Sequence, residues 1–230
     1  MLDIPFYIPF TFMLTTFAAL FFFYRAGQSA AVLYILLLWL ALQGILARSG
    51  FYTVTDTRPP RFLLLVLPLV LGILLIFLTR GGRAWMNGLD YQRLTWLHVV
   101  RVPVELVLFW LYGQQLVPAL ITFEGRNFDI LSGLTAPFIA WYGYMRPRLP
   151  RGMLIGWNLF CMALLLNVVI HAILSAPTPI QQLAFDQPNR AVLYFPFVWL
   201  PGCIVPLVLF SHLAAIRALI KKNELPEHGI

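Results

Sequence analysis

The sequence predicts an all-α, polytopic integral membrane protein: a bundle of seven transmembrane helices with the N-terminus outside and the C-terminus inside. The first observation behind this prediction is composition, because 60% of the 230 residues are hydrophobic, only 11% are charged, and the mean hydropathy is +0.82. Soluble domains carry about 25% charged residues, so this chain is too apolar to be one. The second observation is that apolar runs of about 20 residues, the length that crosses a bilayer, recur along the chain. The third is that basic residues fill the short gaps between these runs, where they orient membrane proteins.

The expected spans are joined by short connections, so residues 1–230 are expected to form a single transmembrane domain. The N-terminal stretch carries only Asp3 as an early charge and lacks the basic start and cleavage site of a signal peptide, which favours an uncleaved first span. The mixed segment "RAWMNGLDYQR" after the third span is expected to lie along the inner surface. The seven expected spans cover residues 4–24, 29–47, 61–79, 94–113, 130–146, 153–175 and 192–217.

The fifth span is short, at about 24 Å for a helix, and it contains Gly133, Pro137 and Gly143, so a re-entrant segment is the alternative. The distribution of basic residues decides between them, because cytoplasmic loops are enriched in Lys and Arg. With seven spans, the inner side holds Arg25, Arg80, Arg83, Arg93, Arg146, Arg148, Arg151, Arg217, Lys221 and Lys222. The outer side then holds Arg48, Arg58, Arg61, Arg126 and Arg190. This bias favours seven spans with the N-terminus outside and the C-terminus inside. The expected location is a plasma membrane, namely a bacterial inner membrane.

The basic pI of about 9.8 does not indicate nucleic acid as a partner, because the cations lie in loops between apolar runs. The expected partner of the chain's surface is the lipid bilayer.

Three ionisable side chains share one face of the fourth span, in "LHVVRVPVEL". His98, Arg101 and Glu105 are spaced i, i+3 and i+7, which places them on one side of a helix. Ionisable groups are costly in hydrocarbon, so they normally face the bundle interior and often mark a ligand or ion path. We expect Arg101 to pair with Glu105 at i, i+4, with Glu105 roughly 15 Å deep, near the midplane. The alternative is an ion pair that only fixes helix packing.

His212 in the seventh span lies at about the depth of His98, one to two helical turns from the inner face. Two imidazoles at one depth can ligate a b-type haem or share a metal, so either cofactor is an alternative. Retinal is not expected, because the only lysines are Lys221 and Lys222 at the inner end of the chain.

A second polar group is expected at the outer end of the bundle. Asn167 and His171 share a face of the sixth span, and His171 lies about one turn from the outer surface. The outer loops "TFEGRNFD" and "FDQPNR" lie at a similar depth, so we expect a polar vestibule there. The loop residues expected to line it are Glu124, Arg126, Asn127, Asp129, Asp186, Asn189 and Arg190.

Four members of this outer group have alternative roles. Asp129 directly precedes the fifth span and is expected to cap its N-terminus. His171, Glu124 and Asp186 have side chains suited to zinc, although no spacing motif joins them.

These features favour a protein that binds, and could translocate, a small polar or anionic solute that enters from the outer side. Arg126 and Arg190 would attract the solute, and Glu105 would act as the gate or proton carrier at the midplane. A seventh span interrupted by Pro196 and Pro206 is typical of helices that line a transport path, although many passive helices contain prolines too.

Two alternatives to the solute hypothesis stay open. The first is a membrane-embedded, metal-dependent enzyme that acts on a lipidic substrate with His171, Glu124 and Asp186 as metal ligands. The second is a non-catalytic subunit or assembly factor that binds a partner subunit or oligomerises, and whose polar groups only fix packing. The chain contains no HExxH, P-loop, GxSxG or CxxC pattern, so it carries none of the common enzyme signatures.

Overall fold

The computed structural model describes residues 2–221, and every regular element in that range is a helix. Five helices are long and apolar enough to cross a membrane, and a pair of helices joined by a sharp bend makes a sixth candidate if it is one span. The chain is therefore an all-helical protein whose helices are consistent with an integral membrane protein. The five are α1 (Tyr7–Gly27), α2 (Ala30–Arg48), a composite helix Tyr91–Gly113, α8 (Arg151–Leu174) and a composite helix Leu200–Lys221, and the bent pair is α3 (Leu63–Leu78) with α4 (Arg80–Asn87).

Several helices change their winding along their length. The first composite helix consists of α5 (Tyr91–Trp96), the 3-10 helix η2 (Leu97–Val100) and α6 (Arg101–Gly113). The second consists of the π-helical η6 (Leu200–Ile204) and α9 (Val205–Lys221). Between them α7 (Ile130–Ala140) continues into the π-helical η4 (Trp141–Met145), and short 3-10 helices lie in the loops at η1 (Phe51–Thr53), η3 (Ala119–Ile121) and η5 (Ala191–Leu193).

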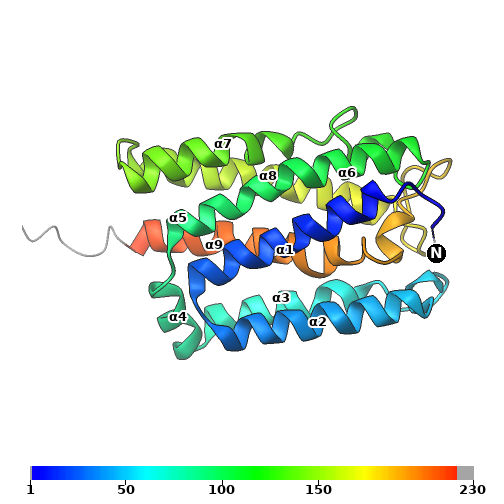
Figure 1. Cartoon of the computed structure of the whole chain (residues 1–230), viewed down its shortest axis with the longest axis horizontal. Coiled ribbons are helices and arrows are strands. Elements are labelled where there is room, and N and C mark those ends of the chain that lie inside the picture. The colour runs from blue at the N-terminus through cyan, green and yellow to red at the C-terminus, as the bar shows by residue number, and fades with distance from the viewer. Residues whose placement is uncertain (1, 222–230) are drawn as a thin grey trace, which may run out of the picture.

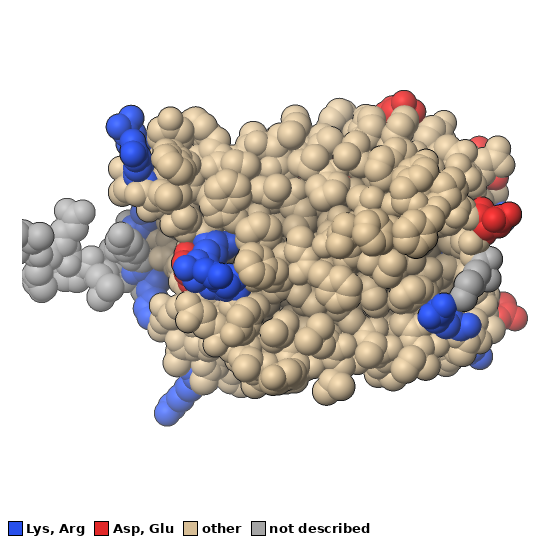
Figure 2. Space-filling view, in the orientation of Figure 1, with Lys and Arg blue, Asp and Glu red and all other residues tan. Residues whose placement is uncertain are grey.

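The long helices run side by side along the longest axis of the molecule (Figure 1). The α5–α6 helix, α7 and α8 lie on one side, α2 and α3 on the other, and α1 and α9 between them. The N-terminus and the α2–α3, α6–α7 and α8–α9 loops lie at one end, which we call the N-terminal end, and α9 ends at the opposite, C-terminal end. Figure 2 shows a broad belt without charges on this face, with most visible Lys and Arg at the C-terminal end and most visible acids at the N-terminal end.

Two tryptophan side chains stabilise the π-helical η6, which directly precedes α9. Pro206 has no N–H, so the carbonyl of Gly202, four residues earlier, loses its helical donor. Trp39 of α2 replaces that donor, with its Nε1 donating to Gly202 O at 2.8 Å. In the opposite direction, Trp199 Nε1 donates to Leu40 O of α2 at 3.0 Å. These two hydrogen bonds connect α2 to η6 and to Trp199 directly before it.

The short helix α4 crosses the C-terminal end of the bundle, because it leaves α3 at an angle of 85°. Thr79 caps it by accepting from Gly82 N at 3.2 Å, and Arg83 donates to the last carbonyl of α3 at 2.8 Å. Trp85 stacks against Phe210 of α9, with ring centroids 5.7 Å apart. Residues 83–87 of the segment "RAWMNGLDYQR" lie in α4, which packs on the bundle, and residues 91–93 begin α5. The expected place of this segment along the inner membrane surface stays a prediction.

Helices cover six of the expected spans with ends shifted by at most three residues. The expected span 192–217 is wrong at its start, because the helix begins at Leu200 and residues before it form η5 and a turn around Pro196. The expected span 130–146 is helical from Ile130 to Met145, but this helix is shorter than the five helices that are long and apolar enough to cross a membrane. The count of seven spans therefore stays a prediction. Lys222, one of the basic residues behind the expected orientation, lies outside the described residues.

Candidate functional site

A cluster of polar side chains lies buried between α6, α7, α8 and α9. Each of its members is no more than 5% exposed, which is unusual for ionisable groups, and every member except His98 makes a side-chain hydrogen bond to another described residue. We call it the buried polar cluster, and it consists of His98, Arg101, Glu105, Asn127, Asp129, Asn158 and His212.

Arg101 forms an ion pair with Asp129, the residue that directly precedes α7. Its Nε donates to Asp129 Oδ2 at 2.6 Å, and its Nη2 bonds the other carboxylate oxygen. Nη2 also donates to the carbonyl of Cys161 at 3.1 Å, and Nη1 lies 3.1 Å from His212 Nε2. All three guanidinium nitrogens are thus engaged with the protein.

Two predictions about these residues are wrong. Arg101 does not pair with Glu105 on its own helix, because Asp129 offers it both carboxylate oxygens. Asp129 stands at the N-cap position of α7 but makes no capping bond, because its backbone is helical (φ −65°, ψ −23°) and its carboxylate turns to Arg101.

A glycine brings Asp129 within reach of Arg101. A Cβ atom at Gly133 would lie 2.7 Å from Val102 Cγ2, which is too short for a carbon atom, and 3.0 Å from Val102 N, which is a tight contact. The first turn of α7 can therefore pack directly on the backbone of α6 only with glycine at this position. This close approach of α6 and α7 places Asp129 beside the guanidinium of Arg101.

Glu105 has one bonded and one free carboxylate oxygen. Its Oε1 accepts from Asn127 Nδ2 at 2.6 Å, and Asn127 also accepts from Asp129 N at 2.9 Å, which fixes the loop before α7. Its Oε2 has no hydrogen-bond partner among residues 2–221, although Glu105 is only 1% exposed. An unbonded acceptor at such burial is costly, so it needs an explanation.

Glu105 is one of the residues that line a cavity of about 100 Å³ between α3, α6, α8 and α9. The walls are almost entirely apolar, and the polar residues in them are Arg101, Glu105, Asp129 and Asn189. Asn189 is fully buried and donates to Ala172 O at 3.2 Å, but its Oδ1 has no partner in the described part of the chain. Two residues that each carry an unpartnered acceptor oxygen, Glu105 and Asn189, therefore line one cavity.

His98 and His212 meet, as their depths allow, but in a stacked arrangement. Their ring centroids are 4.0 Å apart with an interplanar angle of 19°. Because a guanidinium only donates, His212 Nε2 accepts from Arg101, and His212 Nδ1 then carries the hydrogen and donates to Asn158 Oδ1 at 2.9 Å. His212 therefore has no nitrogen left for a metal, and the stacked rings leave no space for iron between them. The haem or shared-metal prediction for this pair does not fit the geometry.

The residues expected to line the outer vestibule fall into two groups, one exposed and one buried. Glu124, Arg126, Asp186 and Arg190 are exposed on the loops, whereas Asn127 and Asn189 are fully buried next to the cavity. The vestibule is therefore not one polar surface, and only its two asparagines and Asp129 reach the bundle interior.

His171 and Asn167 are partly buried and make local bonds. Asn167 Nδ2 donates to Arg126 O at 2.8 Å, and His171 Nδ1 donates to the carbonyl of Asn167 at 2.8 Å. Within residues 2–221 no group of three or more His, Cys, Asp or Glu side chains could hold a metal ion, so the zinc prediction for His171, Glu124 and Asp186 is wrong.

Sequence reasoning missed one member of the cluster, Asn158. Its only signal is that it is a polar residue within an otherwise apolar span, the signal on which Asn167 was selected.

Residues 61–220 match a protein family described as a domain of unknown function (DUF8737). The chain belongs to this family. The DUF8737 region runs from α3 to α9, and it contains the whole buried polar cluster and every residue that lines the cavity. The helices α1 and α2 lie outside the match. No curated protein and no solved structure matches the chain.

Proposed function

We propose that this DUF8737 protein binds a small solute in the cavity beside Glu105 and moves it across a bacterial inner membrane. The observation that carries the proposal is that two residues with an unpartnered, buried oxygen, Glu105 (Oε2) and Asn189 (Oδ1), line one apolar-walled cavity. Apolar walls with a few polar groups are typical of small-molecule sites, and a cavity of about 100 Å³, which is smaller than most such sites, suits a solute of only a few heavy atoms. A solute with hydrogen-bond donors would satisfy both oxygens.

The charges around the cavity favour a donor-bearing or cationic solute over an anionic one. Arg101 is the cation that an anion would need, but Asp129, His212 and a backbone carbonyl occupy all of its nitrogens. The charges of Arg101 and Asp129 cancel, which leaves the carboxyl group of Glu105 without a cation. Of the two classes expected from the sequence, polar and anionic, we therefore propose a polar solute with donors on a small apolar body.

Glu105 supplies a basis for coupling the solute to a proton. A carboxylate without a cation is costly inside a bundle surrounded by lipid, so either a proton or a donor-bearing solute has to accompany it. The two then compete for the same oxygen, and binding the solute from one side and the proton from the other would couple their movements. Glu105 is the gate and proton carrier in this proposal.

The proposed layout has seven spans with the N-terminus outside. The asymmetry of basic residues supports it, and so do α7 and η4, which form a continuous helix of Ile130–Met145 alongside the longer ones (Figure 1). The bend between α3 and α4 supports a third span that ends at the inner surface. In this layout the loops at the N-terminal end face outward.

The proposal is tested with a matched set of four-carbon probes. Butylamine and butanol carry donors, butyrate carries the same apolar body with an anion, and each is added to the detergent-purified protein during thermal unfolding. We expect butylamine to raise the Tm by about 2 °C or more at saturating concentration, since a ligand stabilises the state that binds it, and butyrate to leave the Tm unchanged.

Glu105→Gln should remove the effect of butylamine, and Glu124→Gln, which changes an exposed acid, should keep it. In liposomes that contain a pH-sensitive dye, the wild type should also exchange butylamine for protons. Stabilisation by butyrate, or equal stabilisation of the Glu105→Gln variant by butylamine, contradicts the proposal.

A further inference from the structure

We propose a second site, separate from the cavity beside Glu105, in a groove at the N-terminal end between α1 and α2. This groove binds the phosphate group of a membrane glycerophospholipid and the part of its acyl chain nearest the headgroup. The groove has a volume of about 680 Å³, within the range of small-molecule sites. It shares no residue with the cavity. We call it the α1–α2 groove, and it is lined by Leu2, Ile4, Phe6, Pro9, Met13, Ala47, Arg48, Gly50, Thr53, Tyr194, Phe195 and Pro196.

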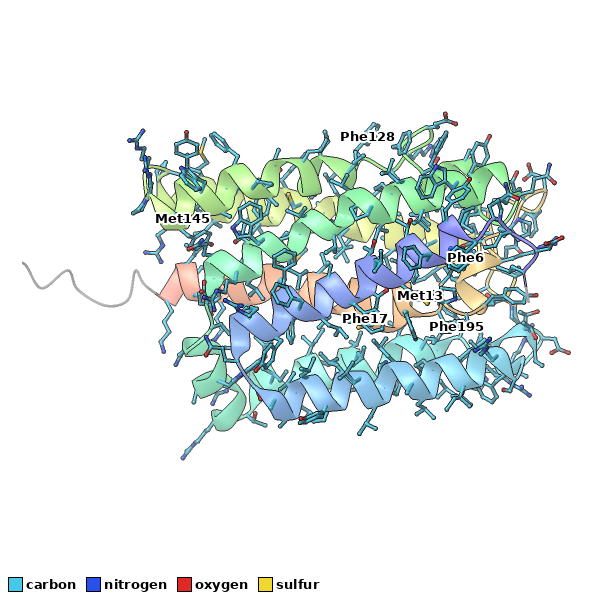
Figure 3. The ribbon with its side chains drawn as sticks, in the orientation of Figure 1. Phe6, Met13, Phe17, Phe128, Met145 and Phe195 are labelled. Atoms are coloured by element: carbon cyan, nitrogen blue, oxygen red, sulfur yellow. The ribbon has the colours of Figure 1, made fainter. Side chains whose placement is uncertain are left out.

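One side of the groove is an apolar row along α1. Figure 3 shows Phe6, Met13 and Phe17 in sequence along α1, with Phe195 lying towards α2 beside Met13. Phe6 is 74% exposed and Phe17 is 49% exposed, so the apolar row continues below the groove towards the middle of the helix. Phe6 and Met13 are seven residues apart, or about 10 Å along the helix axis, which is the length of several methylene groups of an acyl chain.

The other side of the groove carries a cation. Arg48 is the last residue of α2, and its guanidinium carbon lies 5.2 Å from the centroid of the Phe195 ring. A guanidinium over an aromatic face is held by a cation–π interaction, which fixes Arg48 at the groove.

Arg48 makes no hydrogen bond or ion pair to another described residue. The ion pairs within residues 2–221 are Arg93–Asp90 and Arg101–Asp129, and neither includes it. Its N–H groups are therefore available to an anion, and the planar fork of a guanidinium matches the oxygens of a phosphate.

The position of Arg48 relative to the apolar belt selects the occupant. It stands where an apolar helix ends, which is the level of lipid headgroups, and the groove below it is open along exposed phenylalanines. A phosphodiester at Arg48 with an acyl chain along Phe6 and Met13 uses the charge and the apolar wall together. Thr53 Oγ1 donates to Gly50 O at 2.7 Å, so it keeps acceptor capacity for a glycerol or headgroup hydroxyl.

The site is tested by retention of dioleoylphosphatidylglycerol on the detergent-purified full chain, measured by native mass spectrometry and by the Tm. Two comparison probes separate the contributions: dioleoylglycerol, which has no phosphate, and inorganic phosphate, which has no acyl chain. We expect the phospholipid to be retained and to raise the Tm, dioleoylglycerol to bind more weakly, and inorganic phosphate to have no effect.

Arg48→Gln should lower the affinity for the phospholipid about tenfold, the loss of one charge-assisted contact. Met13→Trp should lower it by filling the groove without changing charge. Arg58→Gln, which removes an exposed arginine in the same α2–α3 loop region that does not line the groove, should retain the wild-type affinity.

Three results would overturn the assignment. One is wild-type affinity for the phospholipid in the Arg48→Gln variant. Another is equal stabilisation by inorganic phosphate, which would make Arg48 a simple anion site. The third is a dimer of the wild type that both Arg48→Gln and Met13→Trp dissociate, which would show that a second copy of the chain covers the groove. None of these results depends on butylamine binding, so the two proposed sites fail independently.

Discussion

The ion pair between Arg101 and Asp129 yields the largest expected effect of a single substitution. Arg101 is 2% exposed and Asp129 is 5% exposed, and the pair has two parallel bonds. Replacing Asp129 by Asn keeps the shape but leaves the guanidinium buried without a counter-charge. Removing one partner of a buried pair costs about 3–5 kcal/mol. Because Asn can still accept one bond, we expect a loss of about 3 kcal/mol in the free energy of unfolding.

A double variant separates the charge from the packing. With both residues replaced by Leu, no charge is left uncompensated, but His212 Nε2 loses its donor, which costs about 1–3 kcal/mol. The double variant should therefore be at least as stable as Asp129→Asn. The assay is reversible unfolding in mixed detergent micelles followed by tryptophan fluorescence, with the exposed Glu124→Gln as a control expected within about 0.5 kcal/mol of wild type. A loss below 1 kcal/mol for Asp129→Asn would refute the reasoning.

Three further predictions follow from single contacts. Trp39→Phe removes the donor of Gly202 O and should lower the stability by about 1–3 kcal/mol. Gly133→Val places atoms against Val102 and should lower the stability by about 1–3 kcal/mol, measured by the same unfolding assay. Burial raises the pKa of Tyr52 to about 12. The stability that the neutral Tyr52 phenol contributes is therefore complete below pH 10 and is lost as the pH rises towards 12. Tyr52→Phe should remove that part of the pH dependence of the Tm.

Each of these predictions has a control and a contradicting result. Trp141→Phe changes an exposed indole and should be neutral, and a Trp39→Phe variant that is equally neutral contradicts the role of the indole bond. Gly152→Ala adds a Cβ in open space and should also be neutral, and the close-packing argument fails if the Gly133 variant matches it. For Tyr52, an unchanged fall in Tm between pH 10 and 12 in the Phe variant assigns that fall to other groups.

The helices could be predicted from the sequence because lipid imposes a simple constraint, a continuous apolar run of sufficient length. The prediction fails where residues are apolar for another reason. Residues 191–199 extend the apolar run of the last helix, but they lie in a loop that is buried in protein, and Pro196 interrupts the run. Hydropathy measures burial in either environment and does not distinguish a buried loop from a helix in lipid.

The members of the site were predicted better than their pairing. Spacing on one helix shows which side chains share a face, and His98, Arg101 and Glu105 are all buried together as expected. It does not show what packs opposite that face. The partner of Arg101 comes from a loop 28 residues later in the chain, and it reaches Arg101 because a single glycine lets two helices approach closely.

The unpartnered oxygens argue for a ligand more strongly than the ion pair does. A buried ion pair with every donor bonded, such as that of Arg101, fixes the packing of helices and needs no solute to explain it. Glu105 Oε2 and Asn189 Oδ1 make no hydrogen bond that could fix the packing of helices. An unbonded buried acceptor costs about 1–3 kcal/mol. Apolar side chains at these positions would avoid that cost, so a fold that keeps both oxygens at one cavity is less stable than its own scaffold allows. Lower stability at a cavity is what the proposed binding site predicts, because in that proposal the solute supplies the missing donors.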